Sequence, residues 1–384
     1  MPHRLHPRPA ATPLPAVALA TVLAGLVPGC AAPDPGPAYT RVSSGDVILM
    51  APADATKLDL SATWVSDLEL DAGQEIRFAE VLGDLLVITQ SPDPIATVVE
   101  LDTGEIRWER SIGQQVSPLS RALRQDDELM FIADAVELFG FDVDTADLVR
   151  RQPLDTAASS QPVLHGELVL YGGLNGRVTG HNLRLGFGTW QYQLPAEIET
   201  TPAVRDNQVL VADARGTYAM LLSDTGGLLW RGRTFDAVTA DPSFAEAAAL
   251  VASEDGSLYA LDFNTGQDLW VHQTTTPLTE PAFPLGRNVY LPVPGQALLA
   301  LDATSGEVLW RIETLGGRDT LPVMAMDDDL LAVRGNALLV LDPDDGREKL
   351  SLPTADPVRI IEGPNDSLLL VTDDGRVNRF DAQP

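Results

Sequence analysis

Residues that could catalyse a reaction or hold a metal are few in this sequence and lie far apart. The single cysteine is Cys30, and no histidine sits beside a cysteine or carboxylate at the spacing of a zinc ligand set. The five histidines are His3, His6, His165, His181 and His272. There is no Gly-x-Ser-x-Gly elbow around a nucleophilic serine, and no glycine-rich phosphate loop. We therefore predict no catalytic residue, no metal site and no cofactor, and we expect a protein that is not an enzyme.

One acidic segment, Asp-Pro-Asp-Asp-Gly at residues 342–346, has some likeness to a calcium loop. An EF-hand loop needs ligands at alternating positions and a glutamate at position twelve. Position twelve here is Pro353. Aspartate and threonine side chains bond to nearby backbone amides, and glycine accepts a positive φ, so Asp-x-x-Thr-Gly specifies a tight turn. The sequence therefore assigns these aspartates to a turn and not to a metal.

The turn belongs to a repeat. Residues 261–270, Leu-Asp-Phe-Asn-Thr-Gly-Gln-Asp-Leu-Trp, recur 40 positions later as Leu-Asp-Ala-Thr-Ser-Gly-Glu-Val-Leu-Trp. Eight copies can be traced, of which the first is two residues shorter and the last ends soon after Phe380. The repeated residues are Asp102, Asp142, Asp262, Asp302 and Asp342, then Gly186, Gly226, Gly266, Gly306 and Gly346, then Trp108, Trp190, Trp230, Trp270 and Trp310. A repeat of this length indicates a solenoid or a propeller.

Within each copy, short apolar runs alternate with turn residues, as at 208–213, 218–221 and 228–231. Such runs are typical of strands joined by hairpins, and four of them make one propeller blade. The sequence thus predicts an all-β fold, an eight-bladed β-propeller of four-stranded antiparallel blades. The last copy lacks a fourth strand, so we expect the strand around Trp64 to complete it and close the ring. Arg150 and Leu350 replace tryptophan in two copies, where weaker packing between blades is expected.

The N-terminus has the features of a secretory signal. Two arginines precede an apolar run at residues 16–27, which is shorter than the roughly 20 residues of a membrane-spanning helix. The run ends in Leu-Val-Pro-Gly-Cys, which resembles a bacterial lipobox and implies that Cys30 is lipidated. Ala31 after it implies anchoring in the outer membrane, facing the periplasm. An ordinary signal peptide cleaved after an alanine is the alternative.

These features predict three parts of the chain: a signal peptide at 1–29, the lipidated cysteine with a flexible tether at 30–57, and the propeller at 58–384. The net charge of −29, from 26 basic and 55 acidic residues, argues against binding to nucleic acid or to anionic lipid. It indicates a soluble, self-repelling surface, or alternatively adaptation to a salty environment.

The pattern Ala-Leu-Asp-x-x-Thr-Gly-x-x-x-Trp, seen at residues 260–270, resembles the repeat of the pyrroloquinoline-quinone-type propeller family. One branch of that family contains quinoprotein dehydrogenases, which carry an adjacent cysteine pair beside the cofactor. Another branch contains cofactor-free propellers, notably the BamB family of outer-membrane assembly lipoproteins. The lipobox, the early tryptophan strand, the eight repeats and the end after a third strand resemble the second branch.

This resemblance implies a non-catalytic scaffold of the outer-membrane β-barrel assembly machinery. It would bind a BamA-like barrel subunit and other assembly subunits, and would be monomeric outside that complex. In the family, loops joining the third, fourth and fifth blades bind the partner, and they correspond here to 194–201 and 233–242. The implied contact residues are Leu194, Ile198, Glu199, Arg233, Phe235 and Asp241. A general protein- or ligand-binding propeller of the cell envelope, or a quinoprotein dehydrogenase, remains as an alternative.

Overall fold

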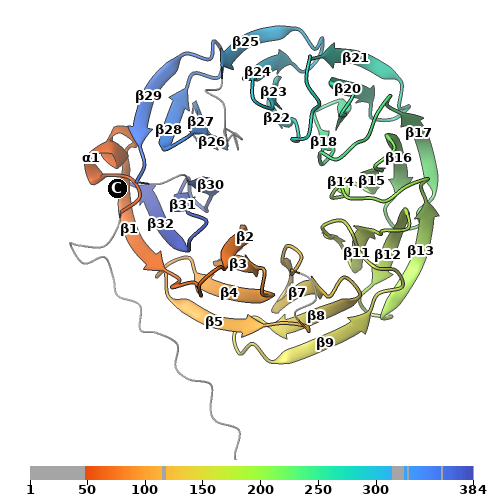
Figure 1. Ribbon diagram of the computed structural model, residues 1–384, viewed down its shortest axis with the longest axis horizontal. Helices are drawn as coiled ribbons and strands as arrows, with labels where there is room; N and C mark the ends of the chain where they lie inside the picture. The colour runs from red at the N-terminus through yellow and green to blue at the C-terminus, as the bar shows by residue number, and fades with distance from the viewer. Residues whose placement is uncertain (1–47, 115–117, 314–323, 327, 356–357, 384) are drawn as a thin grey trace, which may run out of the picture. The chain divides into compact units, whose positions relative to one another are not determined.

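The structure is a computed structural model that describes residues 48–114, 118–313, 324–326, 328–355 and 358–383. The predicted signal peptide, Cys30 and the tether up to residue 47 lie outside the described residues. The described strands form eight four-stranded sheets, in which every neighbouring pair is antiparallel. Figure 1 shows the sheets arranged as the blades of a ring. The predicted eight-bladed propeller is confirmed. No helix of the described part is long and apolar enough to cross a membrane.

Blades 1 to 4 follow one another along the chain, each strand pairing with the next. Blade 1 consists of β2 (Glu75–Leu82), β3 (Leu85–Ser91), β4 (Ile95–Glu100) and β5 (Ile106–Ser111). Blade 2 consists of β6 (Leu123–Gln125), β7 (Glu128–Ala133), β8 (Glu137–Asp142) and β9 (Leu148–Pro153). Blade 3 consists of β10 (Val163–His165), β11 (Leu168–Gly172), β12 (Arg177–Asn182) and β13 (Phe187–Gln193). Blade 4 consists of β14 (Ala203–Arg205), β15 (Gln208–Ala212), β16 (Thr217–Leu222) and β17 (Leu228–Arg233).

Blades 5 to 7 have the same order, and blade 8 combines the two ends of the described chain. Blade 5 consists of β18 (Ser243–Phe244), β19 (Ala248–Ala252), β20 (Ser257–Asp262) and β21 (Asp268–Gln273). Blade 6 consists of β22 (Phe283–Leu285), β23 (Asn288–Val293), β24 (Ala297–Asp302) and β25 (Val308–Glu313). Blade 7 consists of β26 (Met324–Met326), β27 (Asp329–Arg334), β28 (Ala337–Leu341) and β29 (Glu348–Pro353). Blade 8 consists of β30 (Arg359–Glu362), β31 (Leu368–Val371), β32 (Arg376–Ala382) and β1 (Leu60–Asp67), which follows α1 (Pro52–Ala55) and the 3-10 helix η1 (Thr56–Leu58).

The core lies between blades and not within one. Each hydrophobic cluster of the described residues joins two neighbouring blades, and the clusters follow one another round the ring. In β15, Val209 and Val211 pack toward blade 3, whereas Leu210 and Ala212 pack toward blade 5. A middle strand is therefore buried on both faces, which explains why its sequence is an unbroken apolar run.

The repeated tryptophan and glycine meet where two blades join. Trp230 of blade 4 packs over Gly266 in the turn of blade 5, and a Cβ on that glycine would lie 2.5 Å from the indole. The indole Nε1 also donates a hydrogen bond of 3.0 Å to the carbonyl of Phe263 in the same turn. Gly266 has a φ of +68°, so the absence of a side chain serves both the turn and the close approach of the ring. The same bond to the next blade is made by Trp64, Trp108, Trp190, Trp270 and Trp310.

Arg150 takes the tryptophan position in blade 2. Its guanidinium donates to the carbonyl of Leu183 in the turn of blade 3, at the same sequence offset as the tryptophan bonds. Two further bonds of 2.7 and 2.8 Å join it to the carboxylate of Glu128. The substitution therefore keeps the bond to the next blade, although no ring covers Gly186, whose nearest neighbour is Gln152.

The turn aspartates bind backbone amides as predicted, with one correction. Asp262 Oδ1 accepts the amides of residues 264 and 265 at 3.1 and 2.8 Å, and Asp142 and Asp302 do the same in their own turns. In the shortened first copy, Gly104 N instead bonds to the carbonyl of Glu100, so Glu100 holds the first turn position. Asp102 is an exposed residue inside the turn, where it pairs with Arg379 at 3.6 Å.

The ring closes as predicted, because β1 pairs with β32 from Leu60 opposite Ala382 to Asp67 opposite Arg376. The predicted tether boundary at residue 57 is wrong for the described residues. Leu49 and Met50 are fully buried between blades 7 and 8, beside Leu350. This N-terminal segment also bonds to the end of blade 7, because the amide of Ala355 donates to the carbonyl of Leu49 at 2.8 Å.

Candidate partner-binding site

The two loops that the sequence singled out, at 194–201 and 233–242, are each hydrogen-bonded both to the blade that they leave and to the blade that follows. The loop at 194–202 begins with a bond from Leu194 N to the carbonyl of Gly176, and the loop at 234–242 begins with the equivalent bond to Gly216. Leu194 and Ile198 are 2% and 0% exposed, in the cluster around Trp190. The prediction that Ile198 contacts a partner is therefore wrong, because it is a core residue, and Leu194 reaches the surface only at the edge of the cleft described below.

The other four predicted contact residues lie at or near the surface. Glu199, Arg233 and Phe235 are exposed, whereas Asp241 is half-buried. Asp241 Oδ1 accepts a 2.7 Å hydrogen bond from the backbone of Thr201, and this bond joins the two loops. The structure thus brings the loops side by side, and Asp241 holds them together more than it faces outward.

Phe235 is the most exposed large hydrophobic residue of the described part, with 94% of its surface open. Its backbone amide donates a 3.0 Å bond to the carboxylate of Asp255 in the next blade, which also accepts a 2.6 Å bond from the Tyr259 hydroxyl. Burial and this hydroxyl bond raise the pKa of Tyr259 to about 12. Burial alone would raise the pKa of Asp255, but the bonds from Tyr259, Phe235 and Ser257 hold it below its usual value. An anchored backbone therefore presents an exposed ring.

A cleft of about 570 Å³ opens beside these loops, between the outer strands of blades 3 and 4. Tyr192, Leu194 and Pro195 line it from blade 3. Thr217, Arg231 and Arg233 line it from blade 4. The lining combines apolar and aromatic surface with cationic groups, which is the composition of many binding clefts.

The arginines of blade 4 are unusual for so acidic a chain. The side chains of Arg231 and Arg233, and that of Arg215 nearby in the chain, form no ion pair or hydrogen bond with any residue the structure describes. Arg184 and Arg287, which are also well exposed, pair with Glu167 and Asp344. Unpaired arginines beside an apolar cleft form a local positive region that attracts an acidic partner.

Tyr192 and Arg231 line the cleft but are not among the residues predicted from the sequence. A signal for Arg231 exists, since among the outer strands only β17 carries arginine at both the first and the third position after the tryptophan position. Alternate residues of a strand share one face, so the pair had to lie together. Tyr192 offers no such signal, because the cleft forms only when two blades meet.

No metal site accompanies the cleft. Within the described ranges, no group of three or more histidine, cysteine or acidic side chains could hold a metal ion. The segment 342–346 is a turn in which Asp342 accepts the amide of Asp344 at 3.0 Å. Among the described residues, the lining of the cleft contains no histidine, cysteine or acidic side chain.

Comparison with known proteins agrees with this fold. The family described as outer membrane protein assembly factor BamB matches residues 54–202, 196–320 and 295–383. A crystal structure of BamB from Moraxella catarrhalis is similar, with a TM-score of 0.67 and 18% identity over 84% of this chain and 97% of that one. The computationally designed Ika8 protein is also similar, with a TM-score of 0.68 and 17% identity over 82% and 98%. No curated protein sequence matches the chain.

Proposed function

The chain belongs to the family described as outer membrane protein assembly factor BamB, and we propose that it is a non-catalytic scaffold of the outer-membrane protein assembly machinery. Its partner would be a BamA-like barrel subunit. One observation carries the proposal beyond the family: the exposed Phe235 lies just after β17, whose arginine side chains without an acidic partner, Arg231 and Arg233, line the cleft. Exposed aromatic and arginine side chains are the residues that dominate protein–protein binding energy.

The arrangement favours recognition without chemistry. Phe235 offers a hydrophobic anchor on a loop whose backbone is already fixed, so little conformational entropy is lost when a partner covers it. Arg231 and Arg233 would pair with carboxylates of the partner and guide its approach. We further propose that a lipid on Cys30 holds the propeller at the periplasmic side of the outer membrane. Labelling with radioactive palmitate tests that proposal, because the parent chain should be labelled and Cys30→Ser should not.

The decisive experiment is a pull-down of the lipidated protein from native membranes, with mass spectrometry of the retained proteins. We expect a BamA-like barrel protein in the parent sample. Phe235→Ala and the double variant Arg231→Glu/Arg233→Glu should each reduce its recovery about tenfold or more, as loss of a binding hot spot does.

Matched controls separate the site from general effects. Phe187→Ala removes another exposed aromatic side chain, at the start of β13, and Arg287→Glu reverses the charge of an exposed arginine in blade 6. Both should leave recovery unchanged. If no assembly subunit is recovered with the parent chain, or if the site variants retain it as well as the controls do, the proposal is wrong.

A further inference from the structure

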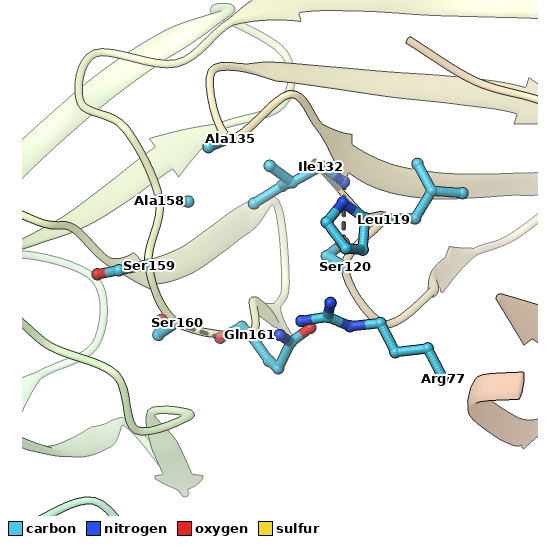
Figure 2. A pocket seen from close by; sticks show the side chains of 10 residues that line it. Arg77, Leu119, Ser120, Ile132, Ala135, Ala158, Ser159, Ser160 and Gln161 are labelled. Atoms are coloured by element: carbon cyan, nitrogen blue, oxygen red, sulfur yellow. Dashed lines mark hydrogen bonds between the residues drawn. The ribbon is translucent and has the colours of Figure 1, made fainter. Parts of the chain in front are cut away.

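A second pocket, of about 140 Å³, lies on the inner side of the ring. The first strands of neighbouring blades contact one another there, and the pocket forms where the segments before β6 and β10 approach β2. Small and apolar side chains, including Leu119, Ile132 and Ala158, make up much of its wall. Figure 2 shows the Arg77 guanidinium pointing across the pocket toward the Gln161 amide.

Arg77 is a half-buried cation without a counterion among the described residues. Its Nε is buried and has no hydrogen-bond partner, and burial lowers the pKa of the guanidinium. Two other arginines near β2 are compensated: Arg121 pairs with Glu80 at 3.4 Å, and Arg359 pairs with Asp373 at 2.5 Å. The centre of the Phe78 ring lies 5.1 Å from the guanidinium carbon but carries no charge, so a half-buried guanidinium without a counterion is expected to hold an anion.

Among the other polar side chains that line the pocket, only Gln161 leaves donors without acceptors in the described residues. Gln161 Oε1 accepts the amide of Arg121 at 2.8 Å, which fixes the orientation of the side chain and leaves both Nε2 hydrogens uncommitted. The hydroxyls of Ser120 and Ser160 each donate to a carbonyl and accept from a backbone amide. The pocket therefore presents the N–H groups of Arg77 and Gln161 and no carboxylate of its own.

We propose that this pocket binds a small carboxylate, held by the Arg77 guanidinium on one side and the Gln161 amide on the other. Arginine and carboxylate form paired, charge-assisted hydrogen bonds, and the second donor favours an anion with two oxygens. The pocket is partly open to solvent and has room for a few water molecules, so it admits an ion of acetate size. The carboxylate is either a free small acid or the side chain of a partner. This inference does not depend on the proposed scaffold function.

Calorimetric titration of the full chain, purified in detergent, tests the proposal with two probes. Sodium acetate represents a free acid, and N-acetyl-glutamate amide represents a protein side chain. Arg77→Gln should weaken binding about tenfold or more, since one charge-assisted bond pair is lost. Arg287→Gln, which removes an exposed arginine on blade 6, is the matched control and should bind like the parent.

A second variant tests the same pocket in case Arg77→Gln fails to fold. Gln161→Glu places a carboxylate opposite Arg77 while keeping the oxygen that accepts the Arg121 amide. It should abolish binding of both probes and raise the melting temperature, because the guanidinium gains a permanent counterion. Binding of acetate supports a free ligand, and binding of the glutamate amide alone supports a partner side chain. The proposal is overturned if neither probe binds, or if Arg77→Gln and Gln161→Glu bind like the parent.

Discussion

The junction between blades 4 and 5 and the junction between blades 2 and 3 achieve the same connection with different chemistry. At the first, the Trp230 indole covers Gly266 and bonds to the carbonyl of Phe263. At the second, Arg150 bonds to the carbonyl of Leu183 and to Glu128, and no ring covers the turn. The bond to the next blade is common to both junctions, whereas the buried ring contact belongs to the tryptophan junctions.

The largest change in the free energy of unfolding should appear when the indole ring of Trp230 is removed. Trp230→Ala should lower the free energy of unfolding by about 3–5 kcal/mol, because it leaves a cavity and an unpaired carbonyl at the junction. Urea denaturation of the parent and the variant measures the change. A loss below about 1 kcal/mol would show that the indole contributes little to the junction.

A comparison of two glycines isolates the ring contact from the strain of the turn. Gly266→Ala should destabilise by about 2–4 kcal/mol, because its Cβ meets Trp230 in addition to the cost of a positive φ. Gly186→Ala has a similar φ of +78° but a nearest neighbour at 3.4 Å, so about 1–2 kcal/mol is expected. Equal losses in urea denaturation would contradict the idea that the tryptophan requires the glycine.

Arg150→Ala should cost about 1–2 kcal/mol, less than Trp230→Ala. It removes the bond to Leu183 and leaves the carboxylate of Glu128 without its partner, but it deletes little buried apolar surface. Thermal denaturation of the parent, of Arg150→Ala and of the double variant Arg150→Ala/Glu128→Gln measures the loss of stability. The second change should recover part of the loss, and failure to do so would mean that the ion pair is not what Arg150 contributes.

The smallest effect concerns the turns themselves. The hydrogen bond from the Thr265 hydroxyl, followed in size by the bond from its backbone amide, holds the pKa of Asp262 below its usual value. This stabilisation is present above the unfolded pKa of about 3.9 and is lost as the pH falls through the lower folded value. Asp262→Asn should lose only the charge-dependent part of this stabilisation at pH 7, because an asparagine oxygen still accepts the same amides, as Asn182 does in blade 3. It should lose less stability than the parent on acidification, and Asn182→Asp should lose more.

The repeat itself allowed the fold to be predicted. The recurring turn residues, the tryptophans and the missing fourth strand of the last copy predicted eight blades and their closure by the strand around Trp64. The boundary of the propeller could not be found in the same way, because residues 48–58 lie outside the repeat. They are placed by contacts with blades 7 and 8, which are far from them in the chain.

The candidate site was predicted less well, and the reason is that exposure is not a local property. Leu194 and Ile198 occur in the correct loop but are turned inward, while Phe235 in the equivalent loop is turned outward. Gln161 precedes a proline that recurs at 162, 202 and 242, but Arg77 carries no repeat signal. The two side chains meet only because the first strands of neighbouring blades converge on the inside of the ring.

The sequence by itself determined which strands form, where the turns fall and how many blades there are. Those features depend on periodicity and on turn chemistry within one 40-residue unit. The tertiary structure alone decided which side chains are exposed, which arginines lack an acidic partner and where the two pockets lie. Those properties arise between blades, where residues some 40 or more positions apart are brought together by the closure of the ring.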